Sequence, residues 1–478
     1  MTRSNLEIIP HCRQPFKRVY QFGFNTCHAP IVMRSDLQEH MAIAHRELGM
    51  RYWRCHGTLS DDVGIVRQGA NGEVEYTFSG LRRIIEAGLR SGARPFFELS
   101  FMPSLLARNP NQTITHYQGI TSPPKNFKAW GSLMTRLGEF LLETYGTREI
   151  SKWYFEVWNE PNIPFWTGTR EEYFQLYRHA VLALKKVSPK FRVGGPSTAR
   201  AEWIGEFLAF AKRTRTPVDF VSTHIYPSDV AFVDSDEGEV NLLGTDFLYR
   251  NFKRVAKEVR AYDKRLPIFW GEWNSSAGPF AANHDDCNNA ALICSTLMGI
   301  EEYGDGSLYW NLSDIYEESR YHFKPFHGGY GMFSVDGIRK SAARAFEFWH
   351  SLEGERLKIE GLPGEAARGA IATGDGNKIC ALLWNHCEPG EKIGPWQVNL
   401  KLAGGTKGKA EVHWILPGQG SAYEAWLKMG SPANLRATQL KSLQQASKPK
   451  KTVCRINRDG VIQLKIHPGT VCLLKTGK

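Results

Sequence analysis

Short apolar runs alternate with helical patterns of apolar residues from about residue 15 to residue 345. In the clearest helical pattern, which follows Pro123 and Pro124, apolar side chains recur on one face until Gly146 ends the repeat. The apolar runs between such patterns are short and rich in aromatic residues, as buried strands are. This alternation predicts repeated strand–helix units that build a parallel sheet.

Eight strands can be assigned from these apolar runs. We expect them near residues 19–25, 51–56, 94–100, 152–158, 191–194, 218–224, 266–272 and 307–311. Eight strand–helix units within residues 15–345 suit a closed (β/α)8 or TIM barrel, a fold that takes roughly 200 to 400 residues. A doubly wound open α/β sheet is the structural alternative.

The pattern changes after about residue 350, where apolar and polar residues alternate with a period of two. Residues 461–466 form one such run, and residues 470–474 form another after a turn at Pro468 and Gly469. A chain of 478 residues also exceeds the size at which a single hydrophobic core keeps growing. We therefore predict a barrel domain over residues 15–345 and an all-β accessory domain, a β-sandwich, over residues 350–478, which residues 1–14 could complete.

The composition is that of a globular protein, with 42% hydrophobic and 23% charged residues. No uncharged run is long enough to span a membrane, and the first ten residues lack the apolar core and cleavage site of a signal peptide. We expect a cytoplasmic protein without a membrane partner. Nine cysteines are scattered without a C-x-x-C pair, which argues against a disulfide framework or a zinc knuckle and predicts reduced thiols.

The net charge of +11 would suggest nucleic acid or another acidic partner if it were spread over the whole chain. Residues 401–478 contain 14 Lys and Arg but only three Asp and Glu, so this segment accounts for the entire excess. The segment has no recognised nucleic-acid-binding motif, and few aromatic residues lie between its basic ones. We expect a solvated basic face and no nucleic-acid partner. Contact with an acidic polysaccharide or with another subunit of a homo-oligomer stays open.

Two glutamates stand in similar surroundings at the ends of the fourth and seventh predicted strands. Glu160 lies in the sequence Trp-Asn-Glu-Pro-Asn, and Glu272 lies in the sequence Trp-Gly-Glu-Trp-Asn. In a barrel, catalytic residues come from the places where strands end and the following loops begin. Cleavage of a glycosidic bond uses such a pair, in which one carboxylic acid protonates the leaving oxygen and one carboxylate attacks the anomeric carbon, ~5 Å apart when configuration is retained.

A single glutamate at the mouth of a barrel could simply be a solvated loop residue. Two glutamates that are each flanked by Trp and Asn argue against that interpretation. Asn159 places an amide beside Glu160. Apolar faces on which a sugar ring can stack are offered by Trp158, Trp273 and Trp310, although any one Trp could equally belong to the core.

Further motifs occur in a fixed order along the chain. They are residues 54–57 with Asp61 and Asp62, residues 95–103, the two glutamate motifs, residues 309–318 and residues 325–329. With this ordered set, which spans most of residues 50–345, the chain resembles glycoside hydrolase family 39, a family of retaining β-xylosidases and α-L-iduronidases. The motif around Glu160 alone is shared across a larger clan, whereas the ordered set is specific to the family.

The resemblance implies roles for particular residues. Glu160 would be the general acid/base and Glu272 the nucleophile. The subsite for the terminal sugar would be lined by His56, Asn159, His224, Tyr226, Trp310 and Glu318. Plainer interpretations stay open, because both histidines could be core residues at strand ends and only one of Glu317 and Glu318 need face inward. After residue 350 the resemblance implies no more than a β-sandwich.

The combined prediction is a retaining, exo-acting glycoside hydrolase on small oligosaccharides, and within the resemblance a β-D-xylosidase that releases xylose from xylo-oligosaccharides of xylan. The main alternative is an α-L-iduronidase, but such enzymes carry Lys two residues after the histidine of strand six, where this chain has Tyr226. A non-catalytic carbohydrate-binding protein is a third alternative, which the presence of both glutamates disfavours. The chain contains no H-E-x-x-H or EF-hand motif, so we expect no metal and no cofactor.

Overall fold

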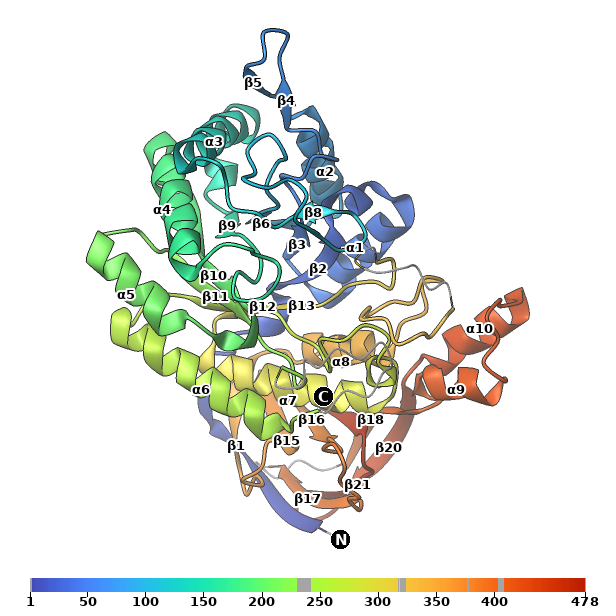
Figure 1. Cartoon of the computed structure of the whole chain (residues 1–478). Helices are drawn as coiled ribbons and strands as arrows, with labels where there is room; N and C mark the ends of the chain where they lie inside the picture. The colour runs from blue at the N-terminus through green and yellow to red at the C-terminus, as the bar shows by residue number, and fades with distance from the viewer. Residues whose placement is uncertain are drawn as a thin grey trace.

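The computed structural model describes residues 2–229, 242–316, 318, 324–375, 378–402 and 408–477. Within these residues, eight parallel strands close into a barrel, which occupies the upper part of Figure 1. In chain order they are β2 (Gly23–His28), β3 (Tyr52–His56), β6 (Arg94–Leu99), β9 (Tyr154–Val157), β10 (Arg192–Thr198), β11 (Phe220–His224), β12 (Ile268–Glu272) and β13 (Gly306–Tyr309). Because β13 pairs with β2, the sheet is closed and a doubly wound open sheet is excluded.

Helices cover the outside of the barrel, each following a strand along the chain. They are α1 (Ser35–Leu48), α2 (Ser79–Arg90), α3 (Phe127–Ile150), α4 (Arg170–Val187), α5 (Ile204–Thr214), α6 (Thr245–Tyr262), α7 (Asn288–Tyr303) and α8 (Ser341–His350). At the start of α4, Thr169 and Glu172 form a capping box that satisfies backbone amides of the first turn. The predicted (β/α)8 barrel is confirmed.

Short elements lie in the connections of the barrel. Two hairpins are formed by β4 (Val66–Gln68) with β5 (Val74–Tyr76) and by β7 (Thr113–Ile114) with β8 (Gly119–Ile120). The 3-10 turns are η1 (Val19–Gln21), η2 (Ala29–Met33), η3 (Ala199–Ala201) and η4 (Ala282–His284).

Two local predictions differ from the structure. The first strand begins at Gly23 rather than near residue 19, because the preceding residues form the turn η1. Val19 and Tyr20 are buried all the same, and a short apolar run cannot by itself distinguish a strand from another buried segment. Gly146 leaves the helical conformation, with φ 74° and ψ 157°, but a further turn carries α3 on to Ile150.

A second sheet combines the N-terminus of the chain with its C-terminal part. In the described residues its ten strands are β1 (Thr2–Gln14), β14 (Glu355–Glu360), β15 (Arg368–Gly374), β16 (Ile379–Asn385), β17 (Trp396–Leu402), β18 (Gly408–Pro417), β19 (Gly420–Ser421), β20 (Lys450–Ile456), β21 (Val461–Ile466) and β22 (Thr470–Thr476). The first strand, β1, lies between β14 and β17, antiparallel to the former and parallel to the latter. The predicted β accessory architecture is confirmed as a mostly-β region, whose strands form one continuous sheet.

Two helices of the accessory region were not predicted from the alternating pattern. They are α9 (Tyr423–Lys428) and α10 (Ala437–Ala446), which lie between β19 and β20 in the chain and project to the right in Figure 1. Trp426 of α9 packs against Phe326, which belongs to the connection from β13 to α8, and Leu443 of α10 belongs to the same apolar cluster. The accessory region therefore contacts a loop that extends from the mouth of the barrel.

Inward-facing side chains fill the barrel in layers, as is usual for this fold. The layer nearer the amino ends of the strands is apolar. It consists of Phe22, Phe96, Phe220, Phe269 and Leu308, with Tyr52 and Tyr154 packed against it. Side chains two positions further along a strand face the same way, so the next layer toward the carboxyl ends is polar. It contains Arg54 in register with Asn25, and Glu98 in register with Glu156.

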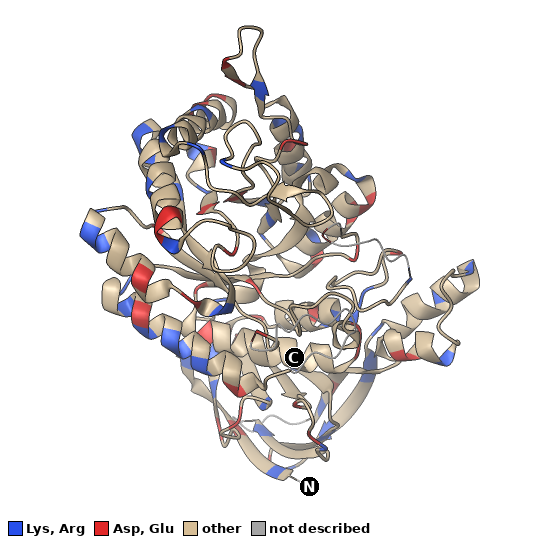
Figure 2. Cartoon of the chain, viewed as in Figure 1, with Lys and Arg blue, Asp and Glu red and all other residues tan. Residues whose placement is uncertain are grey.

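Lys and Arg residues occur throughout the chain, and Figure 2 marks them in blue along α6 and on β20. On β20, Lys450, Lys451 and Arg455 are exposed. Among the described helices, none combines the length and the apolar character needed to cross a lipid bilayer. No two of the nine cysteines, all of which lie in described ranges, are joined in a disulfide.

Candidate active site

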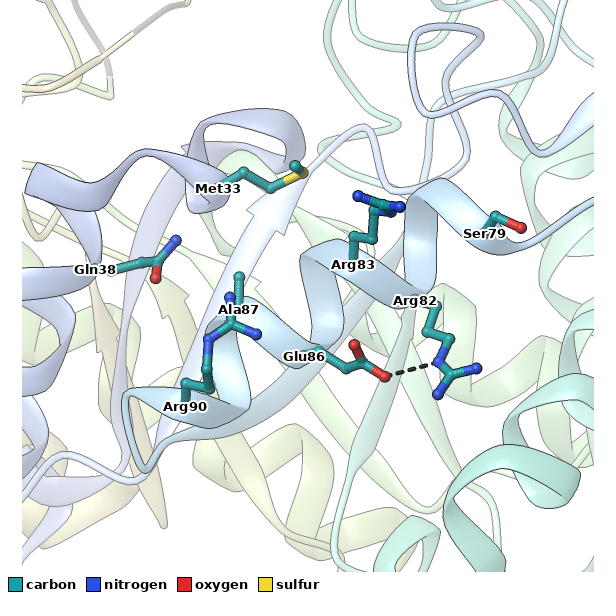
Figure 3. A pocket seen from close by; sticks show the side chains of 8 residues that line it. All are labelled: Met33, Gln38, Ser79, Arg82, Arg83, Glu86, Ala87 and Arg90. Atoms are coloured by element: carbon teal, nitrogen blue, oxygen red, sulfur yellow. Dashed lines mark hydrogen bonds and ion pairs between the residues drawn. The ribbon is translucent and has the colours of Figure 1, made fainter.

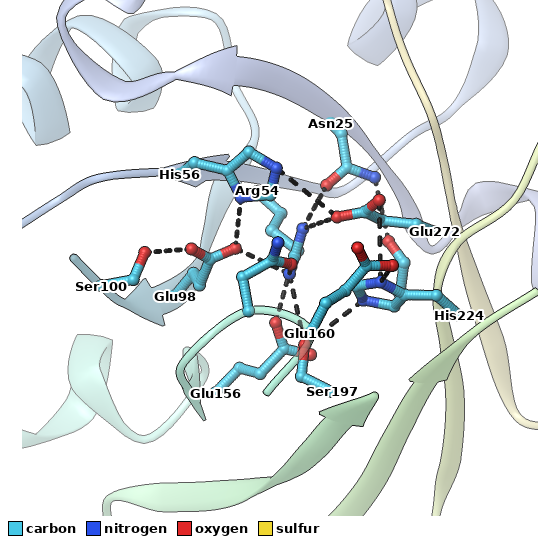
Figure 4. Close-up of polar contacts among 12 residues, drawn as sticks. Asn25, Arg54, His56, Glu98, Ser100, Glu156, Glu160, Ser197, His224 and Glu272 are labelled. Atoms are coloured by element: carbon cyan, nitrogen blue, oxygen red, sulfur yellow. Dashed lines mark hydrogen bonds and ion pairs between the residues drawn. The ribbon is translucent and has the colours of Figure 1, made fainter. Parts of the chain in front are cut away.

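A buried arginine organises the polar layer of the barrel (Figure 4). Arg54, on β3, has no solvent exposure, and its guanidinium bonds to three carboxylates, Glu156 at 2.6 Å, Glu98 at 2.7 Å and Glu272 at 2.6 Å. It also donates to the side-chain oxygen of Asn25 at 3.1 Å. A guanidinium stays protonated at any working pH, so one fixed cation is shared by three carboxylates.

Glu272, the last residue of β12, is buried with hydrogen-bond donors around its carboxylate. Besides Arg54, the hydroxyl of Tyr226 donates to it at 3.1 Å. The Nδ1 atom of His224 and the Nε2 atom of His56 each lie 3.6 Å from one of its oxygens. Burial raises the pKa of Glu272, and His224 and the cationic Arg54 oppose that rise. The carboxylate is therefore surrounded by groups that favour its ionised form.

Glu160 reaches the same space from the turn that follows β9. The backbone is left-handed at Trp158 (φ 72°) and at Glu160 (φ 42°), conformations that cost residues other than glycine about 1 to 3 kcal/mol each. The turn is held because the amide of Glu160 donates to the carbonyl of Ser197 at 2.8 Å and the indole of Trp158 donates to the carbonyl of Phe165 at 2.8 Å. Burial raises the pKa of Glu160 to about 7.

His224, at the end of β11, contacts both glutamates. Its Nδ1 atom lies 2.9 Å from the carboxylate of Glu160, and its Nε2 atom lies 3.3 Å from the hydroxyl of Ser197. Burial lowers the pKa of His224 to about 4, so the ring is neutral near pH 7. The hydrogen bond to Glu160 therefore brings no positive charge, whereas Glu272 has the guanidinium of Arg54 beside it.

His56, at the end of β3, has the opposite charge state. Its Nδ1 atom lies 2.7 Å from Glu98 and its Nε2 atom lies 3.1 Å from Glu318. Burial by itself lowers the pKa of His56, but the two carboxylates outweigh this effect and raise the pKa well above its usual value. The ring is therefore protonated at neutral pH. It packs against the indole of Trp310, with ring centroids 4.8 Å apart.

The structure brings the residues selected from the sequence into one site. They are Glu160, Glu272, His56, Asn159, His224, Tyr226, Trp310 and Glu318, and all of them except Glu318 are buried. Asn159 accepts a hydrogen bond from Arg54 at 2.9 Å. Both histidines bond to carboxylates, so neither is a core histidine that only satisfies the backbone. Glu317, the alternative to Glu318, lies outside the described residues.

Sequence reasoning missed the polar layer beneath the glutamates. Glu98 and Glu156 each lie in the middle of an apolar, aromatic strand, and Arg54 lies two residues before His56 on the same face of β3. A charged residue inside a buried strand is rarely left without a partner, which is the signal that could have found this layer. The identity of the partners depends on the tertiary pairing of strands and could not be read from the sequence.

The two glutamates lie close together. An oxygen of Glu160, an oxygen of Glu272 and a ring nitrogen of His224 all lie within 4.8 Å of one another. Among the described residues, this is the group of His and carboxylate side chains whose spacing would allow them to share a metal ion. The carboxylate of Glu160 is already hydrogen-bonded to His224, and the carboxylate of Glu272 is already hydrogen-bonded to Arg54 and Tyr226. Retaining glycosidases hold their carboxyl groups about 5 to 5.5 Å apart and inverting ones about 6.5 to 9.5 Å apart, so the separation fits the retaining arrangement.

A separate hollow lies on the outer wall of the barrel (Figure 3). It has a volume of about 510 Å³ and lies between η2, α1 and α2. Its charged lining consists of Arg82, Arg83, Glu86 and Arg90, and Arg82 pairs with Glu86 at 2.7 Å. All of these charges come from the outward surface of one helix, so the hollow has neither paired carboxylates nor an inward-facing strand end.

A barrel that presents two buried glutamates at the ends of its fourth and seventh strands defines the class of barrel glycoside hydrolases. The family model of glycosyl hydrolases family 39 matches residues 9–463. The chain is 38% identical to a β-xylosidase of Caldicellulosiruptor saccharolyticus, over 89% of this chain and 88% of that protein. It is 34% identical to a β-xylosidase of Geobacillus stearothermophilus, over 95% of this chain and 91% of that protein.

The similarity extends to three-dimensional structure. The crystal structure of a monomeric β-xylosidase from Caulobacter crescentus CB15 is 29% identical in sequence and matches with a TM-score of 0.89, over 99% of each chain. The chain therefore belongs to glycosyl hydrolases family 39, and it is a glycoside hydrolase.

Proposed function

We propose that this glycoside hydrolase is a retaining, exo-acting β-D-xylosidase that releases xylose from xylo-oligosaccharides. The retaining mechanism is supported by the short distance between the two glutamates, because a carboxylate oxygen of Glu160 and one of Glu272 lie within 4.8 Å of each other. The choice of xylose is supported by the two β-xylosidase relatives, each of which matches most of the chain.

In the first step, Glu160 donates a proton to the glycosidic oxygen and Glu272 attacks the anomeric carbon. Burial keeps the pKa of Glu160 near 7, so a useful fraction of this carboxyl is protonated at neutral pH. Arg54 and Tyr226 hold the carboxylate of Glu272 ionised and oriented. The bond to the leaving oxygen breaks, that oxygen takes the proton, and a covalent glycosyl-enzyme forms on Glu272.

In the second step, water hydrolyses the glycosyl-enzyme. Glu272 carries no charge while it is esterified, so a like charge near Glu160 has gone and the pKa of Glu160 falls. Glu160, now ionised, accepts a proton from the attacking water. The ester bond breaks, Glu272 is released as a carboxylate, and xylose leaves with retained configuration.

The alternative substrate, an α-L-iduronide, carries a carboxylate that would need a cation in the subsite. At the position where the resemblance implies Lys in iduronidases, Tyr226 instead donates to Glu272. The buried cations of the site, Arg54 and His56, are already bonded to carboxylates of the protein. This distribution of charge favours a neutral sugar such as xylose.

A panel of aryl glycosides tests the proposal directly. The β-D-xyloside should be hydrolysed faster than the α-L-arabinoside, the β-D-glucoside and the α-L-iduronide. Proton NMR during the first minutes of xyloside hydrolysis should show β-xylose before mutarotation. Faster cleavage of the iduronide would overturn the xylosidase assignment, and α-xylose as the first product would overturn the retaining mechanism.

A further inference from the structure

Three charged side chains are buried behind the loop that joins β13 to α8. Lys340, directly before α8, lies 2.5 Å from Asp285 and 2.7 Å from Asp314, and none of the three side chains is more than 1% exposed. Burying such ions costs several kcal/mol each in lost hydration, so a buried pair is rarely explained by stability alone. The mechanism proposed above uses none of these residues.

All three charged side chains bind the same short stretch of backbone, residues 328–331. The contacts run from Nζ of Lys340 to the carbonyl of Gly329 (2.8 Å), from the amide of Gly331 to Asp314 (2.8 Å) and from the amide of Gly328 to Asp285 (2.6 Å). A Cβ atom at Gly329 or Gly331 would collide with Asp314. Glycine is therefore needed here for the close approach of backbone and charge.

This stretch is connected to the wall of the sugar subsite. The ring of Tyr330 packs on the ring of Tyr316, with centroids 5.3 Å apart. The hydroxyl of Tyr316 donates to Glu318 at 2.8 Å, and Glu318 lies 3.1 Å from His56. Asp314 itself comes two residues before Tyr316 in the same loop. A continuous set of contacts thus joins the buried charges to Glu318.

We infer that Lys340 is a positioning residue for the terminal-sugar subsite: its charge holds Asp285 and Asp314 together and so places Glu318 against His56. This inference rests on the proposed function. Without the lysine charge, two carboxylates remain buried close together and repel each other, which displaces residues 328–331 and, through the contact of Tyr330 with Tyr316, also Glu318. Glu160 and Glu272 keep their own partners, so the sugar binds more weakly while the chemical step is little changed.

The variant Lys340→Met tests this split. For the aryl β-D-xyloside its KM should rise about 10-fold while kcat stays within about 3-fold, the pattern of binding lost equally from the ground state and the transition state. Arg339→Met is the matched control, because it removes a cation at the neighbouring position that pairs with Glu47 and Glu347 instead. The control should lose stability without a change in KM. A fall in kcat as large as the rise in KM, or an equal KM effect in the control, would overturn the inference.

A double-mutant cycle separates positioning from general destabilisation. If Lys340 acts through Glu318, Lys340→Met should change KM by less than about 2-fold in a Glu318→Gln background, because the two effects are not additive. Full additivity would overturn the inference. If Lys340→Met does not fold, Lys340→Gln takes its place in the cycle, since it removes the same charge but keeps a side-chain hydrogen-bond donor at that position. All KM values can be measured on whichever glycoside the unmodified enzyme hydrolyses. Failure of the xylosidase assignment can therefore be distinguished from failure of the inference about Lys340.

Discussion

Glu160 and Glu272 are the same residue type in the same barrel, yet their surroundings differ. Glu272 touches a permanent cation, Arg54, and accepts a hydrogen bond from Tyr226. Glu160 is bonded to His224, whose pKa is lowered to about 4 and whose ring is therefore neutral. Burial acts on both, but only Glu272 has a fixed positive charge against its carboxylate. The comparison shows how one barrel can favour the protonated form of one carboxyl and the ionised form of the other.

The largest expected effect comes from removing Glu272. Glu272→Ala should lower turnover of an aryl β-xyloside by roughly 10⁴- to 10⁶-fold, because the group that forms the glycosyl-enzyme is gone. Added azide can enter the vacated space and displace the aryl group once, so the product should be α-xylosyl azide. Steady-state kinetics and NMR of the product measure both, and circular dichroism checks that the variant is folded.

Glu160→Ala should have an effect that depends on the leaving group. With xylobiose the loss should be about 10²- to 10⁴-fold, because the leaving oxygen needs a proton. A dinitrophenyl group leaves without one, so the variant should form the glycosyl-enzyme in a rapid burst and then stall.

Azide also tests which glutamate has which role. In Glu160→Ala, azide attacks the glycosyl-enzyme without help from a base, and two inversions should give β-xylosyl azide. If Glu160→Ala gave the α-azide and Glu272→Ala the β-azide, the two roles would be exchanged. Equal losses on both substrates without azide rescue would make Glu160 a structural residue.

Replacing Arg54 by Lys should weaken the distinction between the two glutamates. A lysine is a single point charge and cannot reach all three carboxylates as the guanidinium does. The pKa of Glu272 should then rise, and because Glu272 must be ionised to attack, the acidic limb of the profile of kcat/KM against pH should move up by about 1 pH unit. The alkaline limb, set by Glu160 with its pKa of about 7, should move less, because Arg54 bonds directly to Glu272 but acts on Glu160 only through space. An unchanged acidic limb would contradict the role given to Arg54.

The smallest effect is expected from Tyr226→Phe, which removes one hydrogen bond to Glu272. The rate of glycosylation of a dinitrophenyl xyloside should fall roughly 10-fold, or about 1.4 kcal/mol. Tyr177→Phe is a suitable control, because the hydroxyl of that buried tyrosine donates to the carbonyl of Pro217 at 2.9 Å and not to a carboxylate. Similar rates for both variants would show that the contact of Tyr226 with Glu272 does not assist the reaction.

Much of the fold could be predicted from local sequence pattern. Strands such as β12 are short apolar runs between amphipathic helices. Glu160 and Glu272 could be selected as candidate catalytic residues because each lies at or just after the end of such a run. The start of β2 was misplaced because the residues of η1 are as buried as a strand would be. The helices α9 and α10 were missed because the alternation of the surrounding strands was extended over them.

The charge states of the two histidines in the site could not be predicted from the sequence. His56 and His224 both stand at strand ends and were given the same expected role, yet one is protonated and the other neutral. The difference arises from Glu98 and Glu318, which contact His56 and come from distant parts of the chain. Such long-range pairs are fixed by the closure of the barrel rather than by any local motif.

The most direct test of the account is to trap the glycosyl-enzyme. A 2-fluoro xylosyl inhibitor with a good leaving group should inactivate the enzyme with one label per chain, and peptide mass mapping should place that label on Glu272. The pKa of the remaining free carboxyl, Glu160, should fall in the labelled enzyme, because the neighbouring charge has been removed. A label on Glu160, or on any residue other than Glu272, would contradict the assignment of the two glutamates.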